Sequence, residues 1–299
     1  MKFRKLGKTE VDVSVIGLGT WQFGGEWGKD FTQTEVDEIL HKAHELGINL
    51  IDTAECYGDH LSEKFIGRFL KNAKRKDWVV ATKFGHHFLN DGFKRRDDWS
   101  AEDVLKQLDA SLKSLQTEYV DLYQFHSGSD EVLKNDGLWT MLDKQKQAGK
   151  IRHLGISISS KAASSFQVDY AGEIGVEVIQ VVYNRLERKP EELFFPAAEK
   201  QNFGVLARVP LASGYLSGKY HPGVVFDEND VRHGHKTEDV TRQLKLVEDI
   251  RRNEVPKGVN MAQWALAWCL KHSAVTSVIP GSKNVEQVES NASAADLVE

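Results

Sequence analysis

The chain carries four residues of the types that move protons to and from a carbonyl oxygen: Asp52, Tyr57, Lys83 and His126. A free tyrosine hydroxyl has a pKa near ~10, which is too high for efficient proton exchange at neutral pH. A neighbouring ammonium such as that of Lys83 favours the phenolate and lowers this pKa. Asp52 can keep Lys83 charged and oriented, and His126 can hydrogen-bond a substrate oxygen beside Tyr57. The four residue types therefore predict a proton-transfer site.

Each of these residues also has an ordinary structural interpretation when it is taken alone. Asp52 can cap the following turn, and Tyr57 can be a packed aromatic side chain with a hydrated hydroxyl. Lys83 can be a surface lysine, and His126 can be a buried histidine with satisfied hydrogen bonds. Their joint position at the ends of successive predicted strands is what favours a shared site.

Eight short apolar segments have the composition of buried β-strands. They are residues 14–19, 49–53, 78–82, 119–125, 151–156, 176–182, 204–209 and 275–279. Amphipathic helices are predicted between them, for example over residues 34–46, 63–72, 101–115 and 137–148. Eight strands with a helix after each favour an α/β fold of the closed (β/α)8 type, the TIM barrel, over an open doubly wound sheet.

In such a barrel the C-terminal ends of the strands meet at one rim, where active sites lie. The polar residues at or near those ends are Asp52, Tyr57, Lys83, His126, Ser157 and Gln180. The predicted fold therefore gathers the proton-transfer residues, although they are spread over more than 70 positions of the sequence.

Three further features complete the predicted organisation. Strand-like segments at residues 3–5 and 11–13, separated by Gly7 and Lys8, predict an N-terminal β-hairpin. No linker or low-complexity segment divides the chain, so residues 1–299 are expected to form a single domain. The irregular stretch 211–238 is long for a compact domain, which is typical of a functional lid or a disordered loop.

Composition argues against several classes of protein. The formal net charge of −5 disfavours a surface for nucleic acid or anionic membranes. The two cysteines, Cys56 and Cys269, are too few for a disulfide framework and fit a reducing cytosol. The first five residues lack the apolar segment of a signal peptide, and no stretch approaches the ~18 apolar residues of a spanning helix. We therefore expect a cytoplasmic protein.

Ordered motifs along nearly the whole chain resemble those of the aldo-keto reductase superfamily. The first is Ile16-Gly17-Leu18-Gly19-Thr20-Trp21, and the second is Asp52-Thr53-Ala54-Glu55-Cys56-Tyr57-Gly58 followed by Ser62-Glu63. The others are residues 81–83, 121–126, 149–152 with 155–157, 180–184, 210–219, and 279–283 with Gln287 and Asn291. So many matches in the same order make the resemblance very specific.

The resemblance implies an NADPH-dependent oxidoreductase that reduces a small aldehyde or ketone to an alcohol by hydride transfer. It implies that Asp52, Tyr57, Lys83 and His126 are catalytic, with Tyr57 as the general acid. The cofactor-binding residues that it implies are Thr20, Trp21, Asp52, Ser157, Gln180, Arg208, Pro210, Leu211, Ser213, Gly214, Leu216, Lys219, Gly281, Ser282, Lys283, Gln287 and Asn291.

The cofactor site also has a physical basis in the sequence. Gly17-Leu18-Gly19 is not a Rossmann fingerprint, because no third glycine follows at the required spacing. Ser282 and Lys283 precede a helix that is predicted to start near Val285, where free N–H groups and the helix dipole attract anions. Lys283 adds a full charge for the 2′-phosphate of NADPH, which NADH lacks. A helix cap beside a surface lysine is the alternative interpretation.

Three features depart from the family pattern. The family usually has an asparagine after Ser157, where this chain has Ile158, and that asparagine helps to hold the nicotinamide carboxamide. It usually has a tyrosine stacked on the nicotinamide at the end of the seventh strand, where this chain has Arg208. The chain ends soon after its last predicted helix, so we expect an open pocket with a loose substrate preference.

Other candidate chemistry is disfavoured. His86 and His87 are adjacent and point in divergent directions, without a carboxylate or cysteine at ligand spacing, so no metal site is expected. Cys56 is interpreted as a small packing residue rather than a reactive thiol. Two alternative functions stay open, namely an NADPH-binding regulatory subunit with slow turnover and a metal-dependent barrel hydrolase.

Overall fold

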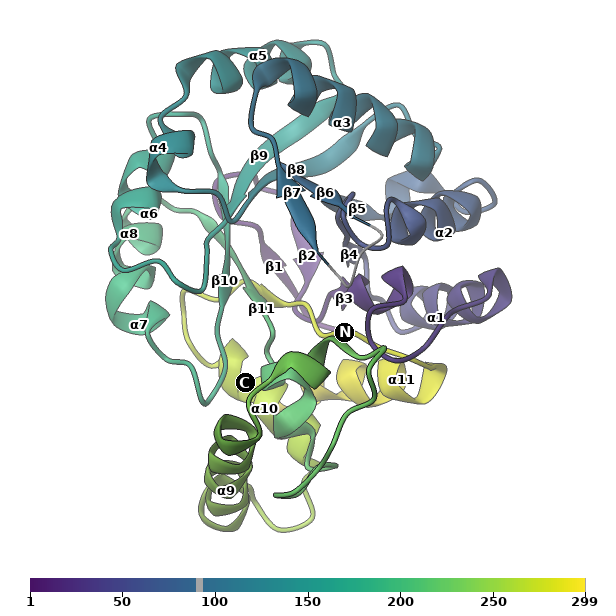
Figure 1. Cartoon of the computed structure of the whole chain (residues 1–299), viewed down its shortest axis with the longest axis vertical. Helices are drawn as coiled ribbons and strands as arrows, with labels where there is room; N and C mark the ends of the chain where they lie inside the picture. Colours follow the sequence, from purple (N-terminus) through teal and green to yellow (C-terminus); the bar gives the residue numbers. More distant parts are fainter. Residues whose placement is uncertain (90–93, 299) are drawn as a thin grey trace.

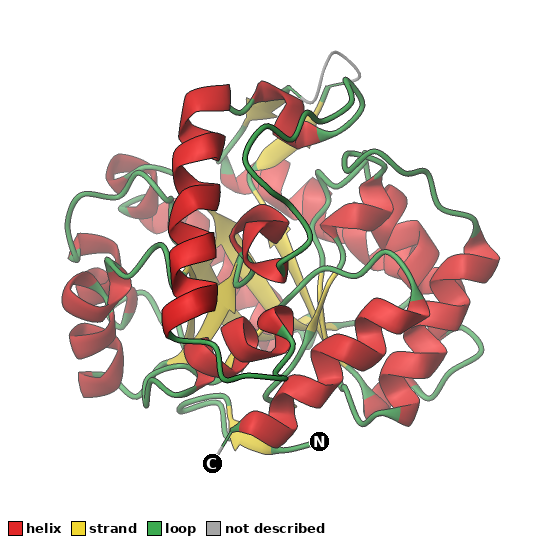
Figure 2. Cartoon of the chain, turned by 90° about the horizontal axis from the view of Figure 1, so that it is seen from below, coloured by secondary structure: helices red, strands yellow, loops and turns green. Residues whose placement is uncertain are grey.

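The computed structural model describes residues 1–89 and 94–298. Eight parallel strands form one sheet in the order β12-β11-β10-β9-β8-β5-β4-β3. Parallel bridges from Ile16 to Val278 and from Gly19 to Gly281 join the first strand to the last. The sheet therefore closes on itself, with the strands inside and helices around them (Figure 1, Figure 2), and the predicted (β/α)8 barrel is confirmed.

The barrel strands overlap the eight predicted segments. They are β3 (Leu18–Gly19), β4 (Leu50–Asp52), β5 (Val79–Phe84), β8 (Val120–His126), β9 (Ile151–Ser157), β10 (Val178–Val182), β11 (Gly204–Arg208) and β12 (Ser277–Val278). The longest, β8 and β9, are buried along most of their length, as expected for parallel strands that are covered on both faces. Two short antiparallel pairs lie outside the barrel sheet: β1 (Phe3–Lys5) with β2 (Asp12–Ser14), and β6 (His86–Phe88) with β7 (Arg95–Asp97).

The predicted N-terminal hairpin is the pair β1–β2, and it closes one end of the barrel. Its residues Leu6 and Val13 share a buried cluster with Leu50 and Val178, which begin or nearly begin their strands. The hairpin therefore covers the N-terminal ends of the strands. The opposite rim, at the C-terminal strand ends, is left for the functional loops.

The helices around the barrel follow the strands in sequence. They are α1 (Gln33–Glu45), α2 (Leu61–Leu70), α3 (Ala101–Leu115), α4 (Asp130–Leu133), α5 (Asp136–Gln147), α6 (Phe166–Ala171), α7 (Pro190–Leu193), α8 (Phe195–Lys200), α9 (Thr237–Asn253), α10 (Met261–Leu270) and α11 (Val285–Ser293). Short 3-10 helices occur at η1 (Trp21–Gly24), η2 (Arg75–Asp77), η3 (Ala212–Ser217), η4 (Val231–Gly234) and η5 (Ala294–Leu297). No helix in the described part of the chain is long and apolar enough to cross a membrane.

Helix α3 shows why the sequence specifies these elements. The hydroxyl of Ser100 accepts a hydrogen bond from the N–H of Asp103 and caps the first turn. Val104, Leu108 and Leu115 recur at helical spacing and are fully buried against the barrel. The same apolar spacing allowed residues 101–115 to be predicted as an amphipathic helix with the bounds that the structure has.

The stretch 211–238 is more ordered than its irregular sequence indicates. It contains η3 and η4, and α9 starts within it at Thr237. A second hydrophobic cluster joins η3 to α9 and α10 through Leu216, Leu244 and Ala265. The η3 part of the segment is therefore packed against the outer helices α9 and α10, whereas much of residues 221–238 is exposed (Figure 1).

Candidate active site

Polar side chains occupy the C-terminal rim of the barrel. Strands β4, β8, β9 and β11 end at Asp52, His126, Ser157 and Arg208 respectively, and Lys83 is the penultimate residue of β5. Because the strands are parallel, these ends face the same way. Tyr57 lies in the loop between β4 and α2, which follows the C-terminal end of β4 and so lies at the same rim.

Lys83 is the centre of a buried hydrogen-bond network. Its Nζ atom lies 2.7 Å from Asp52 Oδ2, 2.8 Å from the carbonyl oxygen of Thr53 and 3.2 Å from the hydroxyl of Tyr57. An ammonium has three protons to donate, and these three acceptors match that number. The Lys83 side chain is fully buried, so it is held in one position between the strand end and the tyrosine.

Two glutamines orient the other oxygen of Asp52. The side-chain amides of Gln180 and Gln124 donate to Asp52 Oδ1 at 2.7 and 3.1 Å. Gln180 was predicted as a cofactor residue, whereas Gln124 was present only inside the motif that ends at His126. Since both amides are buried and neutral, they fix the carboxylate without removing its charge, which remains for Lys83.

Burial decides the protonation of the tyrosine. It raises the pKa of Tyr57 to about 12, although the Lys83 ammonium acts in the opposite direction. The sequence-based expectation of a lowered pKa is therefore wrong in sign, because the loss of solvent outweighs the nearby charge. Burial works against the Lys83 ammonium too, but the negative charge of Asp52 raises its pKa overall. Tyr57 thus carries its proton at neutral pH, beside a charged Lys83.

His126 lies next to Tyr57, on the side of the hydrogen-bond network that faces the pocket. The rings of His126 and Tyr57 are edge to face with their centroids 6.3 Å apart, and Trp21 stacks on the other side of Tyr57 at 5.8 Å. Burial, and then the charge of Lys83, holds the pKa of His126 well below its usual range. A neutral imidazole and a protonated phenol therefore lie side by side.

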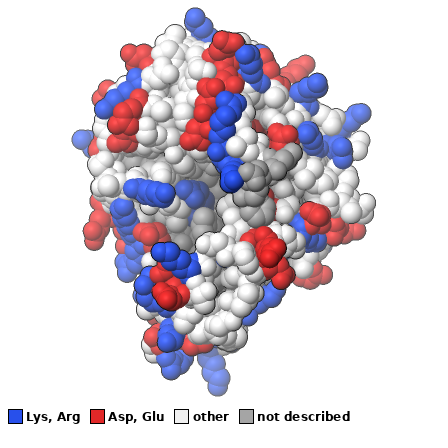
Figure 3. All heavy atoms as spheres, viewed as in Figure 1, with Lys and Arg blue, Asp and Glu red and all other residues white. Residues whose placement is uncertain are grey.

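A pocket of about 650 Å³ extends from this rim. In the space-filling view a hollow lies near the middle of the face, with Lys or Arg side chains beside it (Figure 3). The predicted residues that line the pocket are Thr20, Trp21, Asp52, Tyr57, His126, Gln180, Arg208, Pro210, Leu211, Ser213, Gly214, Lys219, Gly281, Lys283, Gln287 and Asn291. Its size is within the range of about 300–1,000 Å³ that is usual for small-molecule sites.

Four predicted site residues do not line the pocket. Lys83 lies behind Tyr57 and donates a hydrogen bond to its hydroxyl. Ser157 is buried, and its hydroxyl bonds no group among residues 1–89 and 94–298. Leu216 is turned into the hydrophobic cluster under η3, and the hydroxyl of Ser282 accepts from the amide of Asn291 at 3.1 Å. These last two side chains are thus engaged in packing and in holding Asn291.

Comparison with known proteins shows the family to which the chain belongs. The model of the Aldo/keto reductase family matches residues 15–299. This chain belongs to the aldo-keto reductase family. It is therefore related to oxidoreductases that act on aldehydes.

Individual relatives align along nearly the whole chain. The oxidoreductase YqkF of Bacillus subtilis is 32% identical over 299 residues, which cover 99% of this chain and 92% of the relative. The NADH-specific methylglyoxal reductase of Escherichia coli is 30% identical over 317 residues, covering 99% and 94%. The holo structure of aldo-keto reductase AKR11C1 from Bacillus halodurans superposes with a TM-score of 0.82 at 30% identity, covering 99% and 91%.

The far end of the pocket in this aldo-keto reductase carries several cations. Lys283 lines the pocket, and its Nζ donates to the carbonyl oxygen of Trp27. Burial, and then the charge of Arg232, lowers the pKa of Lys283. The expected free N–H groups at the start of α11 are partly engaged: Lys283 N–H donates to the side chain of Gln287, whose own N–H is capped by Asn284. The positive charge in this region therefore comes chiefly from side chains.

Sequence reasoning did not find Arg232. It lies in η4, is only 5% exposed, and forms a bidentate pair with Asp230 at 2.8 and 2.6 Å. Its guanidinium covers the ring of Phe226 and borders the pocket opposite Lys283. A lone arginine in a long polar stretch looks like any solvated charge, so the sequence held no signal that distinguished it.

Two of the three departures from the family pattern, Ile158 and Arg208, are in contact. Arg208 Nη2 donates to the carbonyl oxygen of Ile158 at 3.1 Å. Arg208 borders the pocket, and its buried Nε has no acceptor among the residues that the structure describes. Burial lowers the pKa of this guanidinium. The arginine is thus anchored to the end of β9, on the side of the rim where Ser157 lies.

Proposed function

We propose that this aldo-keto reductase reduces an aldehyde or ketone to an alcohol with NADPH, and that Tyr57 is the proton donor. The observation that carries the proposal is the chain of contacts from Asp52 through Lys83 to the Tyr57 hydroxyl, at 2.7 and 3.2 Å. It places a protonated phenol at the pocket wall and a buried ammonium directly behind it. That arrangement supplies a proton and stabilises the negative oxygen that remains.

Each residue has a distinct part in the proposed reaction. When bound, NADPH supplies a hydride to the carbonyl carbon. Tyr57 gives its proton to the carbonyl oxygen, so that hydride and proton together convert the carbonyl group to an alcohol. Lys83 stabilises the phenolate that remains, and Asp52 keeps Lys83 charged. His126, as a neutral imidazole, hydrogen-bonds the carbonyl oxygen and orients it toward Tyr57.

The residues of the pocket are compatible with a nicotinamide cofactor. The buried hydroxyl of Ser157 has no bonding partner among the described residues, and it lies beside the rim, where a carboxamide requires a partner. The pocket extends from Gln180 and Arg208 at this rim to Lys283, whose charge suits a 2′-phosphate. One relative is named as NADH-specific, so the preference for NADPH rests on Lys283 rather than on the family.

The test is Tyr57→Phe, which removes the transferable proton and little volume. A positioned general acid contributes about 10²- to 10⁴-fold in rate, so we expect turnover of aldehydes to fall by at least the lower factor. Binding of NADPH, measured by fluorescence titration, should change little. Tyr170→Phe is the matched control, because Tyr170 stacks on Phe166 in α6, far from the pocket.

Two outcomes would contradict the proposal. If Tyr57→Phe reduced aldehydes as fast as the unmodified enzyme, the proton would have to come from another group. If the unmodified protein bound NADPH but did not oxidise it with any of a panel of aldehydes and ketones, the alternative of a slow regulatory subunit would be favoured.

A further inference from the structure

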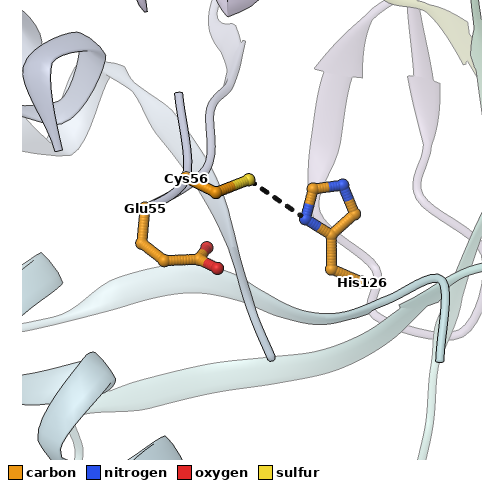
Figure 4. Close-up of side chains that lie close together, drawn as sticks. All are labelled: Glu55, Cys56 and His126. Carbon is orange, nitrogen blue, oxygen red and sulfur yellow. Dashed lines mark hydrogen bonds between the residues drawn. The ribbon is translucent and has the colours of Figure 1, made fainter. Parts of the chain in front are cut away.

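Three potential metal ligands converge beside the proton donor. Glu55 and Cys56 precede Tyr57 in the loop after β4, and His126 ends β8. One ligand atom from each residue lies within 4.8 Å of the other two, and Cys56 Sγ is 3.8 Å from His126 Nδ1. In the close-up view the three side chains point into one common space (Figure 4). Carboxylate, thiol and imidazole are thus brought together from two strand ends.

The carboxyl group of Glu55 is a second, independent observation that points to a ligand at this cluster. It is only 3% exposed, and its Oε2 bonds no group in the described parts of the chain. Its other oxygen accepts a hydrogen bond from the backbone N–H of His86 at 3.2 Å. A buried carboxyl oxygen without a partner is costly and needs an explanation.

The spacing is close to that of a tetrahedral zinc site. Zinc lies about 2.3 Å from a thiolate sulfur and about 2.0–2.1 Å from an imidazole nitrogen, which puts tetrahedral S and N ligands roughly 3.6 Å apart. The observed 3.8 Å differs from this by a few tenths of an ångström. The Glu55 oxygen lies within 4.8 Å of the other two ligand atoms, so rotation of its side chain has to bring it closer to reach a tetrahedral position. Cys56 and His126 both border the pocket, so an ion has an entry path and space for a fourth ligand.

We propose that Glu55, Cys56 and His126 bind a divalent cation of the zinc class, and that the bound ion inhibits carbonyl reduction. A thiolate with an imidazole selects zinc-like cations over magnesium or calcium, which prefer oxygen ligands only. Binding displaces the thiol proton and leaves Glu55 ionised against the metal. The ion is coordinated by His126 Nδ1 and occupies the space beside Tyr57. The carbonyl group of the substrate is therefore excluded from that space. The inhibition rests on the proposed reductase function, whereas the binding does not.

Nearby charges determine how tightly the site holds an ion. Lys83, Arg208 and Arg95 place positive charges near His126, and these charges repel a cation that binds there. The site is therefore expected to be reversible and removable by a chelator, unlike a closed structural zinc site that the fold requires.

The binding test uses Co²⁺ as a spectroscopic probe of the cofactor-free protein. We expect visible bands of tetrahedral Co²⁺ with a near-ultraviolet thiolate band, and their loss when Zn²⁺ is added. Cys56→Ala should abolish the thiolate band and weaken Co²⁺ binding at least tenfold, and Glu55→Gln should weaken it by a smaller factor. Cys269→Ala is the matched control, because Cys269 is equally buried but lies in α10, outside the pocket, and it should retain the full spectrum.

The second measurement is inhibition of aldehyde reduction by Zn²⁺. Inhibition that a chelator reverses, and that requires at least tenfold more Zn²⁺ in the isosteric variant Cys56→Ser, supports the proposal. A Co²⁺ spectrum that is unchanged in both Cys56→Ala and Cys56→Ser would overturn the site. Zn²⁺ binding at this site without loss of activity would overturn the inhibition. If the protein reduced no carbonyl compound, the spectra alone would decide the site and the proposed function alone would fail.

Discussion

Replacing Lys83 by methionine removes the ammonium and keeps most of the volume of the side chain. The exposed fractions of the Lys83 and Asp52 side chains are 0% and 4%, so the carboxylate cannot turn to water when its partner is lost. At 2.7 Å and an effective dielectric near 20, the attraction between the two charges is about 6 kcal/mol. Breaking such a buried pair from one side costs about 3–5 kcal/mol, because the remaining charge stays uncompensated. That is a large share of the ~5–15 kcal/mol that stabilises a typical domain.

The matched control is Lys150→Met, which breaks a pair of nearly the same length at the surface. Lys150 Nζ lies 2.8 Å from Asp109, but the two side chains are 37% and 56% exposed. An exposed pair contributes at most about 1 kcal/mol, so the same substitution should cost several-fold less there. Urea unfolding with comparable m-values gives both free energies. The double variant Asp52→Asn, Lys83→Met should lose less than the sum of its single changes, because it leaves no unpaired charge.

Equal losses of stability for Lys83→Met and Lys150→Met would refute this reasoning. They would mean that the Lys83–Asp52 pair is solvated or that its charges are neutralised in the folded protein. Strict additivity of Asp52→Asn and Lys83→Met would refute the coupling between the two charges.

The remaining predictions concern the cofactor and acid stability. Lys283→Met should weaken NADPH binding about 10- to 150-fold, the worth of a hydrogen bond to a charged group, and leave NADH binding nearly unchanged in a parallel titration; equal losses would place the 2′-phosphate elsewhere. If Arg208 faces the nicotinamide, its charge at about 4 Å disfavours the positive ring of NADP⁺ by up to ~4 kcal/mol at a dielectric near 20. Arg208→Tyr should then lower the ratio of the NADP⁺ to the NADPH dissociation constant at fixed salt, and an unchanged ratio would show that it does not face the ring. His153 and Lys146 overcome the effect of burial and lower the pKa of Glu177 to about 2, so its ionised form is favoured by folding. Stability from Glu177 is therefore present above the unfolded pKa near ~4.3 and is lost as the pH falls toward 2. The urea midpoints of Glu177→Gln and the unmodified protein should differ most at pH 7, and the difference should shrink clearly by pH 3. A constant difference would contradict the assignment.

The barrel was predictable because its strands are continuous apolar runs. β5 and β8 are buried almost throughout, and such runs are hard to mistake for amphipathic helices when Gly and charged residues bound them. The β6–β7 hairpin was not predicted, since His86-His87 and Arg95-Arg96 lack the apolar alternation that marks a strand. Helix α9 was not named from the sequence, although its buried residues Val240, Leu244, Val247 and Ile250 recur at helical spacing.

The site was predictable as a set of residues but not as an electrostatic system. Strand ends identified Asp52, Lys83 and His126, since a parallel barrel brings those ends to one rim. The pKa of Tyr57 was not predictable, because it depends on how much solvent the surrounding side chains exclude. Arg232 was missed for a related reason: only its packing on Phe226 and its pair with Asp230 distinguish it from a surface charge.

The seam between β3 and β12 has a consequence for the order in which the protein is made. One wall of the pocket comes from Gly19 and Trp21, and the adjoining wall comes from Gly281 and Asn291, at the opposite end of the sequence. A chain emerges from the ribosome N-terminus first, so the proton-transfer residues, the last of which is His126, are all synthesised in the first half. They remain without an enclosing pocket until the final strand is released and the bridges from Ile16 and Gly19 can form. In a nascent chain the proton-transfer residues are therefore present long before the pocket that encloses them can form.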